Sequence, residues 1–418
     1  MIEAKIAVLL KKPMTQNFVS LVLLQGVNYL LPLATFPFLV RVLGMERWGL
    51  VYFGYTFIQY FVLFTDFGFN LSATKYISSH RSDEKLINRY LNSAFICRIF
   101  IGAISFIILF LLISIFDRFH QDAGFYLLYF GIVAGNVMFP MWFFQGMEKM
   151  KYITIFNIVA KLVSFIPFFI FIRKPEDYML VPVFYTAGYV IAGLISLYIV
   201  YFKERMKWFL PTFTEIKFAL TDSSTYFLSR ISVSAFTYSN SLVLGLVCGN
   251  MAVACYGAAE KLYQAYNQLL TPFTGVLFPY MAKTRDIYFF KKIFKRIVTS
   301  NIFLLTGILL ASFWIIRIIY GQEAQAGSLT VFRILLSGCF FTIPSILLGY
   351  PFLAAIGYSS YTNWTVIIVS LVHLLGLTVL FFSGYLTINT VAVLVVLAEL
   401  LLVTFRVRAV AYYKLFKR

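Results

Sequence analysis

The sequence predicts an all-α polytopic membrane protein of about twelve transmembrane helices, and three observations lead to this prediction. Hydrophobic residues make up 61% of the 418 residues, and charged residues make up only 12%. The mean hydropathy is +0.84, whereas a soluble domain is only about half apolar. Apolar runs recur along the whole chain, and many have the roughly 20 residues that a helix needs to cross a bilayer.

The expected helices follow one another through short connections. They cover residues 17–43, 49–73, 90–116, 125–145, 152–172, 178–202, 223–247, 252–282, 298–320, 328–356, 361–383 and 386–405. The first span is too long for a cleaved secretory signal, and no small-residue cleavage pattern closes it, so we expect it to stay in the mature chain.

The distribution of basic residues predicts the topology. A net charge of +18 is also found in nucleic-acid binders, but these gather Lys and Arg on a soluble face, and this chain has no room for a soluble domain. Most of the 35 basic residues lie on connections that share a side with the N-terminus, above all in residues 203–217 and 283–296. The positive-inside rule therefore predicts an inner-membrane protein with both termini in the cytoplasm. Because there is no soluble face for it, we expect no nucleic-acid partner.

Charged residues inside a span are costly, and they usually face the bundle interior or a water-filled cavity. The sequence places eight of them there: Asp66, Arg98, Lys161, Arg230, Glu260, Lys261, Arg333 and Glu399. Positions three or four apart stack on one side of a helix, so spacing tests whether a charge belongs to a polar face. By this test, Glu399 has almost no polar neighbours on its own helix.

In the first half of the chain, spans one, two and five carry polar faces. The aligned residues are Gln25, Asn28 and Thr35, then Tyr55, Gln59 and Asp66, then Asn157, Lys161 and Ser164. Polar faces of this kind are suited to line a hydrated route through a helix bundle. A simple membrane anchor does not need such a route.

Residues 203–222 form the longest connection, and they mix bases with Trp208 and Pro211. They are expected to form an amphipathic elbow along the inner surface, between a six-helix lobe of residues 1–202 and another of residues 223–418. Weak internal similarity supports two lobes, because the second span begins GMERWGLVYFGY at Gly44 and the eighth begins GNMAVACYGAA at Gly249.

In the second half, polar faces lie on spans seven and eight. The aligned residues are Arg230, Ser234, Thr237 and Ser241 on one, and Lys261, Gln264, Gln268 and Thr271 on the other, with Glu260 at its border. The intramembrane bases outnumber the acids by five to three, so the surplus favours an anionic ligand such as a phosphate or an acidic sugar. Interhelical hydrogen bonding and counter-ion roles for the acids are the alternative explanation.

The candidate ligand-binding residues, led by two cations on these faces, are Arg230, Lys261, Lys161, Arg333, Arg98, Gln25, Asn28, Gln59 and Gln264. Asp66 or Glu260 is the candidate for carrying a coupling ion, because a buried carboxylate near bases has a tunable proton affinity. The four cysteines form no CxxC pair, and His373 alone among three histidines lies in a span, so we expect no metal and no cofactor.

Residues 18–78 resemble the opening of Wzx-type O-antigen flippases of the polysaccharide-transport family, within the MATE-like MOP superfamily. The most recognisable pieces are Gln25 and Pro32, the RVLG of residues 41–44 followed by the WG of residues 48–49, and the DFGF of residues 66–69. The resemblance extends in pattern over essentially the whole chain. It implies two six-helix lobes around a central cavity lined largely by spans one, two, seven and eight.

The resemblance also implies a function, which is the translocation of an undecaprenyl-pyrophosphate-linked oligosaccharide from the cytoplasmic to the periplasmic leaflet by alternating access. Its implied partners are this lipid-linked substrate, membrane lipid, an O-antigen polymerase and a chain-length regulator. The similar lipid II flippases have basic residues in span one, where this chain has Gln25 and Asn28.

Three other classes compete with this interpretation. An ATP-driven pump needs a G-x-x-x-x-G-K-[ST] loop, which the chain lacks. A MATE-like multidrug exporter is the closest rival, but its cationic substrates prefer a surplus of carboxylates. A membrane-embedded O-antigen polymerase or glycosyltransferase typically has a sizeable outer loop, and the expected outer loops are short, so we expect no enzyme.

Overall fold

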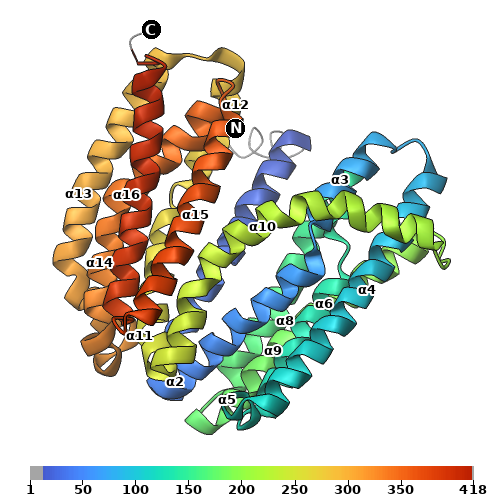
Figure 1. Ribbon diagram of the computed structural model, residues 1–418, viewed down its shortest axis with the longest axis horizontal. Helices are drawn as coiled ribbons and strands as arrows, with labels where there is room; N and C mark the ends of the chain where they lie inside the picture. Colours follow the sequence, from blue (N-terminus) through green and yellow to red (C-terminus); the bar gives the residue numbers. More distant parts are fainter. Residues whose placement is uncertain (1–12, 417–418) are drawn as a thin grey trace, which may run out of the picture. The chain divides into compact units, whose positions relative to one another are not determined.

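The computed structural model describes the backbone of residues 13–416 and, within it, the side chains of residues 31–227, 231, 237–271, 273–322 and 326–416. Every regular element in the described range is helical, which confirms the predicted all-α class (Figure 1). The first elements are α2 (Pro13–Asp66), α3 (Phe69–Ser79), α4 (Glu84–Ile115), α5 (Asp117–His120), α6 (Ala123–Met138), α7 (Met141–Gly146), α8 (Met150–Phe171) and α9 (Leu180–Tyr198). The later ones are α10 (Phe213–Cys248), α11 (Asn250–Gln268), α12 (Thr271–Thr284), α13 (Ile287–Tyr320), α14 (Gln322–Leu348), α15 (Ser359–Phe382) and α16 (Ile388–Tyr412).

Three short helical turns complete the described chain. A 3₁₀ turn (Pro175–Met179) precedes α9, a π-helical turn (Ile199–Lys203) follows it, and a second π-helical turn (Gly349–Ala354) follows α14. By length and composition, nine helices in the described residues can cross a bilayer. Expected spans seven and eight coincide with the more polar α10 and with α11 followed by α12. The chain is therefore a multi-pass helical membrane protein.

Helix α2 contains the first expected span and most of the second, which continues across a break at Phe67 and Gly68 into α3. The backbone leaves helical geometry at Gly44, with φ 74° and ψ 166°, in a region that is essentially restricted to glycine. Gly249, directly before α11, has φ 88° and ψ −179°. The two glycines that the sequence similarity pairs therefore share one backbone conformation, and a helix begins directly after each of them.

The chain forms two compact units, each made of two separate stretches. Unit 1 consists of Met1–Thr35 with Gly54–Ile231, and unit 2 consists of Phe36–Phe53 with Ser232–Arg418. The stretch around the Gly44 turn therefore belongs to unit 2. The expected lobes of residues 1–202 and 223–418, with an elbow between them, stay a prediction.

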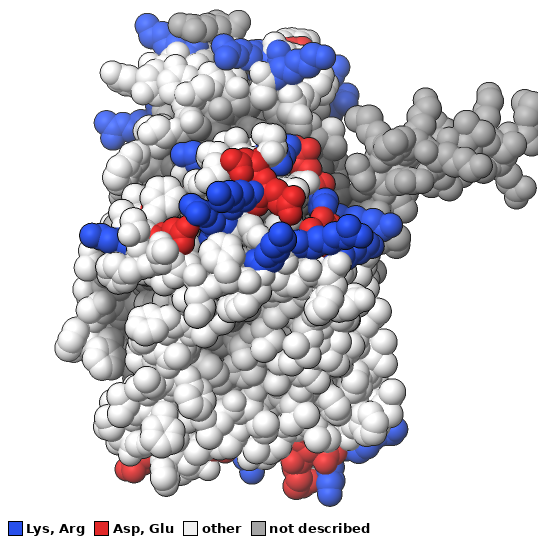
Figure 2. Space-filling model, turned by 90° about the vertical axis from the view of Figure 1, so that its right-hand side faces the viewer, with Lys and Arg blue, Asp and Glu red and all other residues white. Residues whose placement is uncertain are grey.

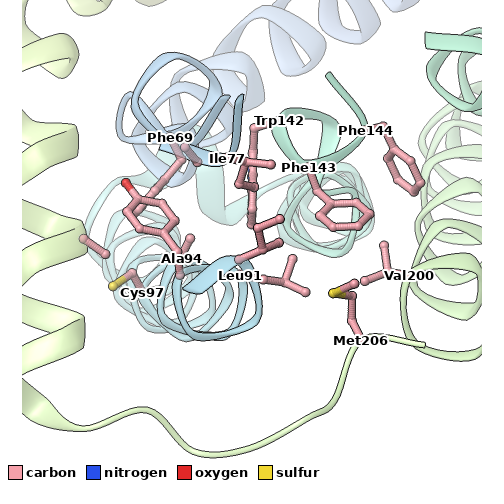
Figure 3. Packing of buried hydrophobic residues seen from close by; sticks show 14 of the residues in the cluster. Phe69, Ile77, Leu91, Ala94, Cys97, Trp142, Phe143, Phe144, Val200 and Met206 are labelled. Carbon is pink, nitrogen blue, oxygen red and sulfur yellow. The ribbon is translucent and has the colours of Figure 1, made fainter. Parts of the chain in front are cut away.

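A cluster of buried apolar side chains holds one end of unit 1 together (Figure 3). Trp142, Phe143 and Phe144 come from the short helix α7, and all three are fully buried. Ile77 of α3 and Leu91 of α4 belong to the same cluster. The cluster therefore joins three helices at the end where the chain leaves α9.

The connection that follows α9 is bound to α4. The backbone amide of Lys207 donates to Oδ1 of Asn88 (3.1 Å), and Nδ2 of Asn92 donates to the carbonyl oxygen of Lys207 (2.9 Å). Beyond this anchor, Trp208 and Leu210 are 50% and 78% exposed. Exposed apolar side chains beside bases suit a bilayer surface.

One face of the molecule shows how charge is distributed (Figure 2). Charged side chains gather in a band across this face and in a smaller group at its lower end, and the surface between them is uncharged. An uncharged zone between two charged rims is typical of a protein that lies in a bilayer.

Candidate functional site

Helix α11 carries two of the charged residues inside unit 2, Glu260 and Lys261. Glycines bring the stretch Phe36–Phe53 close to this helix. A Cβ atom on Gly257 would lie 2.3 Å from the ring of Tyr52. A Cβ atom on Gly49 would lie 1.9 Å from the carbonyl oxygen of Asn250. Both positions therefore need glycine for this stretch to pack directly on α11.

Glu260 is a buried carboxylate with two hydroxyl donors. The Tyr52 hydroxyl donates to Oε2 of Glu260 (2.8 Å), and the Ser241 hydroxyl lies 3.5 Å from the same oxygen. Glu260 also interacts electrostatically with Lys261, the next residue on α11. A buried charge is tolerated only when it is paired and hydrogen-bonded, and this carboxylate has both kinds of partner.

Lys261 is half-buried against aromatic rings. Its Nζ lies 5.1 Å from the ring centroid of Phe36 and 5.0 Å from that of Tyr52. The ammonium also donates to Oε1 of Gln264 (3.3 Å), one turn further along α11. Cation–π contacts of this kind are worth about 0.5–2 kcal/mol, so the rings favour the charged form of this half-buried ammonium.

A cavity of about 160 Å³ lies beside Glu260, within unit 2. Its polar wall is formed by Asn240, Tyr256, Glu260, Tyr263, Gln264 and Glu399. Two carboxylates thus face one small interior space, with phenol and amide groups around them. Such oxygen-rich surroundings can accept a proton or a small cation.

The orientation of Asn240 in this wall is fixed by its neighbours. Nδ2 of Asn240 donates to the hydroxyl of Tyr256 (3.0 Å), and Oδ1 lies 2.8 Å from Nε2 of His373. Because Oδ1 can only accept, the proton of this bond is on Nε2 of His373. His373 is fully buried, so this bond lies inside the unit.

In unit 1, two of the predicted intramembrane charges, Asp66 and Arg98, interact electrostatically. The Arg98 side chain is 1% exposed. It donates to the backbone carbonyls of Thr65 (3.3 Å), Asn136 (2.8 Å) and Phe139 (3.2 Å). Arg98 therefore satisfies carbonyls where α6 ends and where α2 approaches its end.

The other predicted residues are distributed over both units. Lys161 on α8 and Gln59 on α2 are half-buried, and Arg333 on α14 is exposed and donates to Oγ of Ser312 (2.9 Å). Three predicted side chains, which sit on α2 or α10, lie outside those that the structure describes: Gln25, Asn28 and Arg230. The structure thus brings Lys261, Gln264 and Glu260 together, and a binding role for every candidate stays a prediction.

Sequence reasoning missed two charged residues. Glu399 was isolated on its own helix, yet it lines the same cavity as Glu260. Arg406 comes directly after the last expected span, residues 386–405. It is nevertheless 4% exposed, and its Nη1 donates to Oγ of Ser345 (2.9 Å). The seven-residue spacing between Glu399 and Arg406, which is two helical turns, was the signal in the sequence that could have paired them.

Over the described residues, no group of three His, Cys, Asp or Glu side chains could hold a metal ion.

Comparison with known sequences gives a family match. Residues 14–285 match the family described as "Polysaccharide biosynthesis protein". A protein of Escherichia coli (strain K12) named "Putative O-antigen transporter" is 28% identical over 274 residues, which is 66% of this chain and 66% of that protein. A protein of the same name from Shigella dysenteriae is 28% identical over 285 residues, which is 67% of this chain and 70% of the relative. The match thus spans just under two thirds of the first relative's length.

Comparison with solved structures concerns the fold alone, because the identities are low. The lipid II flippase MurJ in its inward closed conformation has a TM-score of 0.75 at 13% identity, over 94% of this chain and 87% of MurJ. A multidrug resistance MATE family transporter of the MOP superfamily, in its inward-facing conformation, has a TM-score of 0.68 at 15% identity, over 93% of this chain and 96% of the transporter.

Proposed function

Because the chain belongs to the polysaccharide biosynthesis protein family, we propose that it is a flippase for lipid-linked oligosaccharides in the bacterial inner membrane. The resemblance to the polysaccharide-transport family within the MOP superfamily is confirmed by the family match and by the fold. The proposed substrate is an undecaprenyl-pyrophosphate-linked O-antigen repeat unit, which moves from the cytoplasmic to the periplasmic leaflet by alternating access. The names of two relatives and the fold shared with a lipid II flippase support this substrate class.

The observation that carries the proposal is the environment of Lys261. Its ammonium lies against Phe36 and Tyr52, on a helix within the residues that match the family. Aromatic rings stabilise the cation without neutralising it, whereas a carboxylate in direct contact would neutralise it. The charge therefore stays available to a pyrophosphate or an acidic sugar, and Arg230 is the second proposed contact.

Glu260 is the proposed coupling residue. It lies beside Lys261 in the chain and lines the same cavity as Glu399, so a proton or cation bound there acts directly on the charge of Lys261. Asp66 is the alternative, but it interacts with Arg98, whose guanidinium is already engaged with three backbone carbonyls. Coupling through Glu260 links ion binding to substrate binding within one unit.

A MATE-like multidrug exporter is the second candidate, because the chain shares the fold of such a transporter and because Glu260 and Glu399 face one cavity. Paired carboxylates suit a cationic drug. The aromatic environment of the Lys261 ammonium favours the anionic, lipid-linked substrate instead.

The deciding experiment uses a bacterium deleted for the gene. We expect polymerised surface polysaccharide to disappear and unpolymerised lipid-linked repeat units to accumulate in the cytoplasmic leaflet, because the polymerase and the chain-length regulator act after translocation. Accumulation in the periplasmic leaflet would instead place the protein after flipping. Unchanged polysaccharide together with increased drug sensitivity would identify an exporter.

A further inference from the structure

A second, larger groove lies in unit 2, away from the charged cavity. It has a volume of about 370 Å³, which is within the range of ligand-sized pockets. It forms where α11 ends at Gln268 and α12 begins at Thr271, and α13 supplies the opposite wall. The groove opens to the surface, because Leu269, Phe273 and Leu304 on its walls are 60%, 59% and 50% exposed.

The inner wall of the groove offers little to a polar ligand. Its two polar side chains bond to each other, since the Tyr266 hydroxyl donates to Oδ1 of Asn301 (2.6 Å). Nδ2 of Asn301 donates in turn to the carbonyl oxygen of Cys339 (3.3 Å). With these groups satisfied, and apart from the exposed Arg296 and Ser300, leucine, isoleucine and phenylalanine side chains form the remaining wall, so the occupant of this part must be apolar.

One end of the groove is cationic. Arg296 lines it and is exposed, and among the described side chains it forms no ion pair. Lys292 and Lys295 lie on the same end of α13, whereas the acidic Asp286 is engaged at the helix start, where it accepts from the amide of Phe289 (2.9 Å). A basic cluster directly outside a membrane-spanning helix attracts anionic lipid headgroups, at about 1 kcal/mol per base.

We propose that this groove binds one anionic phospholipid, with an acyl chain against the apolar wall and the phosphate at Arg296. The length of the slot fits a single leaflet. The eight residue-to-residue steps from Arg296 to Leu304 rise about 12 Å along α13, and half of the bilayer core is about 15 Å. A long polyisoprenyl chain would leave most of its length outside the slot. The bound lipid stabilises the break between α11 and α12. Lys261 is on α11, so the lipid lies at the end of the helix that carries it.

The first test compares two lipids on the unmodified full-length protein in detergent, by native mass spectrometry. We expect one phosphatidylglycerol per chain to be retained. Phosphatidylcholine with the same acyl chains keeps the phosphate, but its choline cation cancels the net charge of the headgroup beside Arg296 and the neighbouring bases, so it should bind about tenfold more weakly. Equal retention of the two lipids overturns the proposal. Displacement of phosphatidylglycerol by an equimolar amount of undecaprenyl phosphate also overturns it, because the groove would then be a site for the carrier lipid.

Matched variants locate the site. Arg296→Ala is expected to weaken phosphatidylglycerol binding about tenfold, whereas Lys85→Ala removes an exposed base from unit 1 and should leave binding within twofold. Ser300→Trp fills the groove and should abolish retention of the lipid, whereas Thr299→Trp, on an exposed neighbouring residue, should not. Equal effects within either pair contradict the assignment.

Discussion

At the scale of single residues, the contact between Glu260, Tyr52 and Lys261 combines stability with function. The carboxylate depends on the Tyr52 hydroxyl and on the neighbouring ammonium, and the same phenol ring contacts that ammonium. One side chain from a distant helix therefore sets the environment of both charges. A change at any of the three affects the other two.

Lys261→Met keeps the length of the side chain and removes its charge. We expect it to lower the melting temperature of the purified protein, because Glu260 loses its nearby cation, and to reduce surface polysaccharide in a complementation assay about tenfold or more. The double variant Glu260→Gln with Lys261→Met should recover the melting temperature but not the polysaccharide. Recovery of both by the double variant would assign the pair a purely structural role.

Helical spacing predicted that Lys261 and Gln264 share a face, and the hydrogen bond between them agrees. It did not predict Tyr52, which is 208 residues away from Glu260 in the chain, because spacing compares positions on one helix only. Glu399 was missed for the same reason, since its polar neighbours in the cavity belong to other helices.

At the scale of helices, two features of the structure depend on backbone groups. Arg98 on α4 binds three carbonyls near helix ends, and two of them, those of Asn136 and Phe139, also accept from backbone amides. Gly49 allows α2 to approach the backbone of Asn250. Each feature leads to a prediction about stability.

Arg98→Leu removes the donor of the Thr65 carbonyl, at a cost of about 1–3 kcal/mol for a buried group, and it removes the cation beside the buried Asp66. We expect the amount of folded protein in membranes, measured by fluorescence-detected size exclusion, to fall sharply. Arg98→Lys should rescue little, because an ammonium cannot span three separated carbonyls.

The control for Arg98 is Arg89→Leu, on the same helix. Arg89 is exposed and pairs with Glu215 at 3.4 Å, and surface pairs contribute at most about 1 kcal/mol. Normal amounts of the Arg98→Leu protein, combined with lost transport, would return Arg98 to the list of substrate contacts.

Gly49→Ala places a methyl group against the carbonyl oxygen of Asn250, so α2 must move away from α11. Overpacking of this kind costs about 1–3 kcal/mol and should lower the melting temperature in detergent. Gly307→Ala on α13 is the control, because a Cβ atom there meets nothing within 4 Å and alanine favours a helix. A melting temperature that Gly49→Ala does not change would show that α2 and α11 are further apart in solution.

Hydropathy predicted where the helices lie, since each of the twelve expected spans lies mostly on described helix, although the second crosses the break between α2 and α3 and the fourth crosses the break between α6 and α7. It did not predict the break between α11 and α12 or the π-helical turn at Gly349–Ala354. Both interruptions occur inside apolar sequence, where composition does not change. At the π-helical turn the guanidinium of Arg406 occupies the space of a Gly349 side chain, a tertiary contact that no local pattern reveals.

At the scale of the whole molecule, charge and hydropathy predict an even number of crossings. We expect a fluorescent protein fused after residue 418 to fluoresce, and alkaline phosphatase fused there to be inactive, because the C-terminus is expected in the cytoplasm. Alkaline phosphatase fused at Gly384, in an expected outer connection, should be active. The opposite pattern at both positions would invert the topology and the proposed direction of transport.

The division into units has a consequence for biosynthesis. Phe36–Phe53 leaves the ribosome about 180 residues before the rest of unit 2, which at roughly 5–20 residues per second is a delay of about 10–40 s. During that interval Gly49 and Tyr52 lack the surface of α11 on which they later pack. The nascent first hairpin must therefore be held, by lipid or by an insertion factor, until its distant partner has been translated.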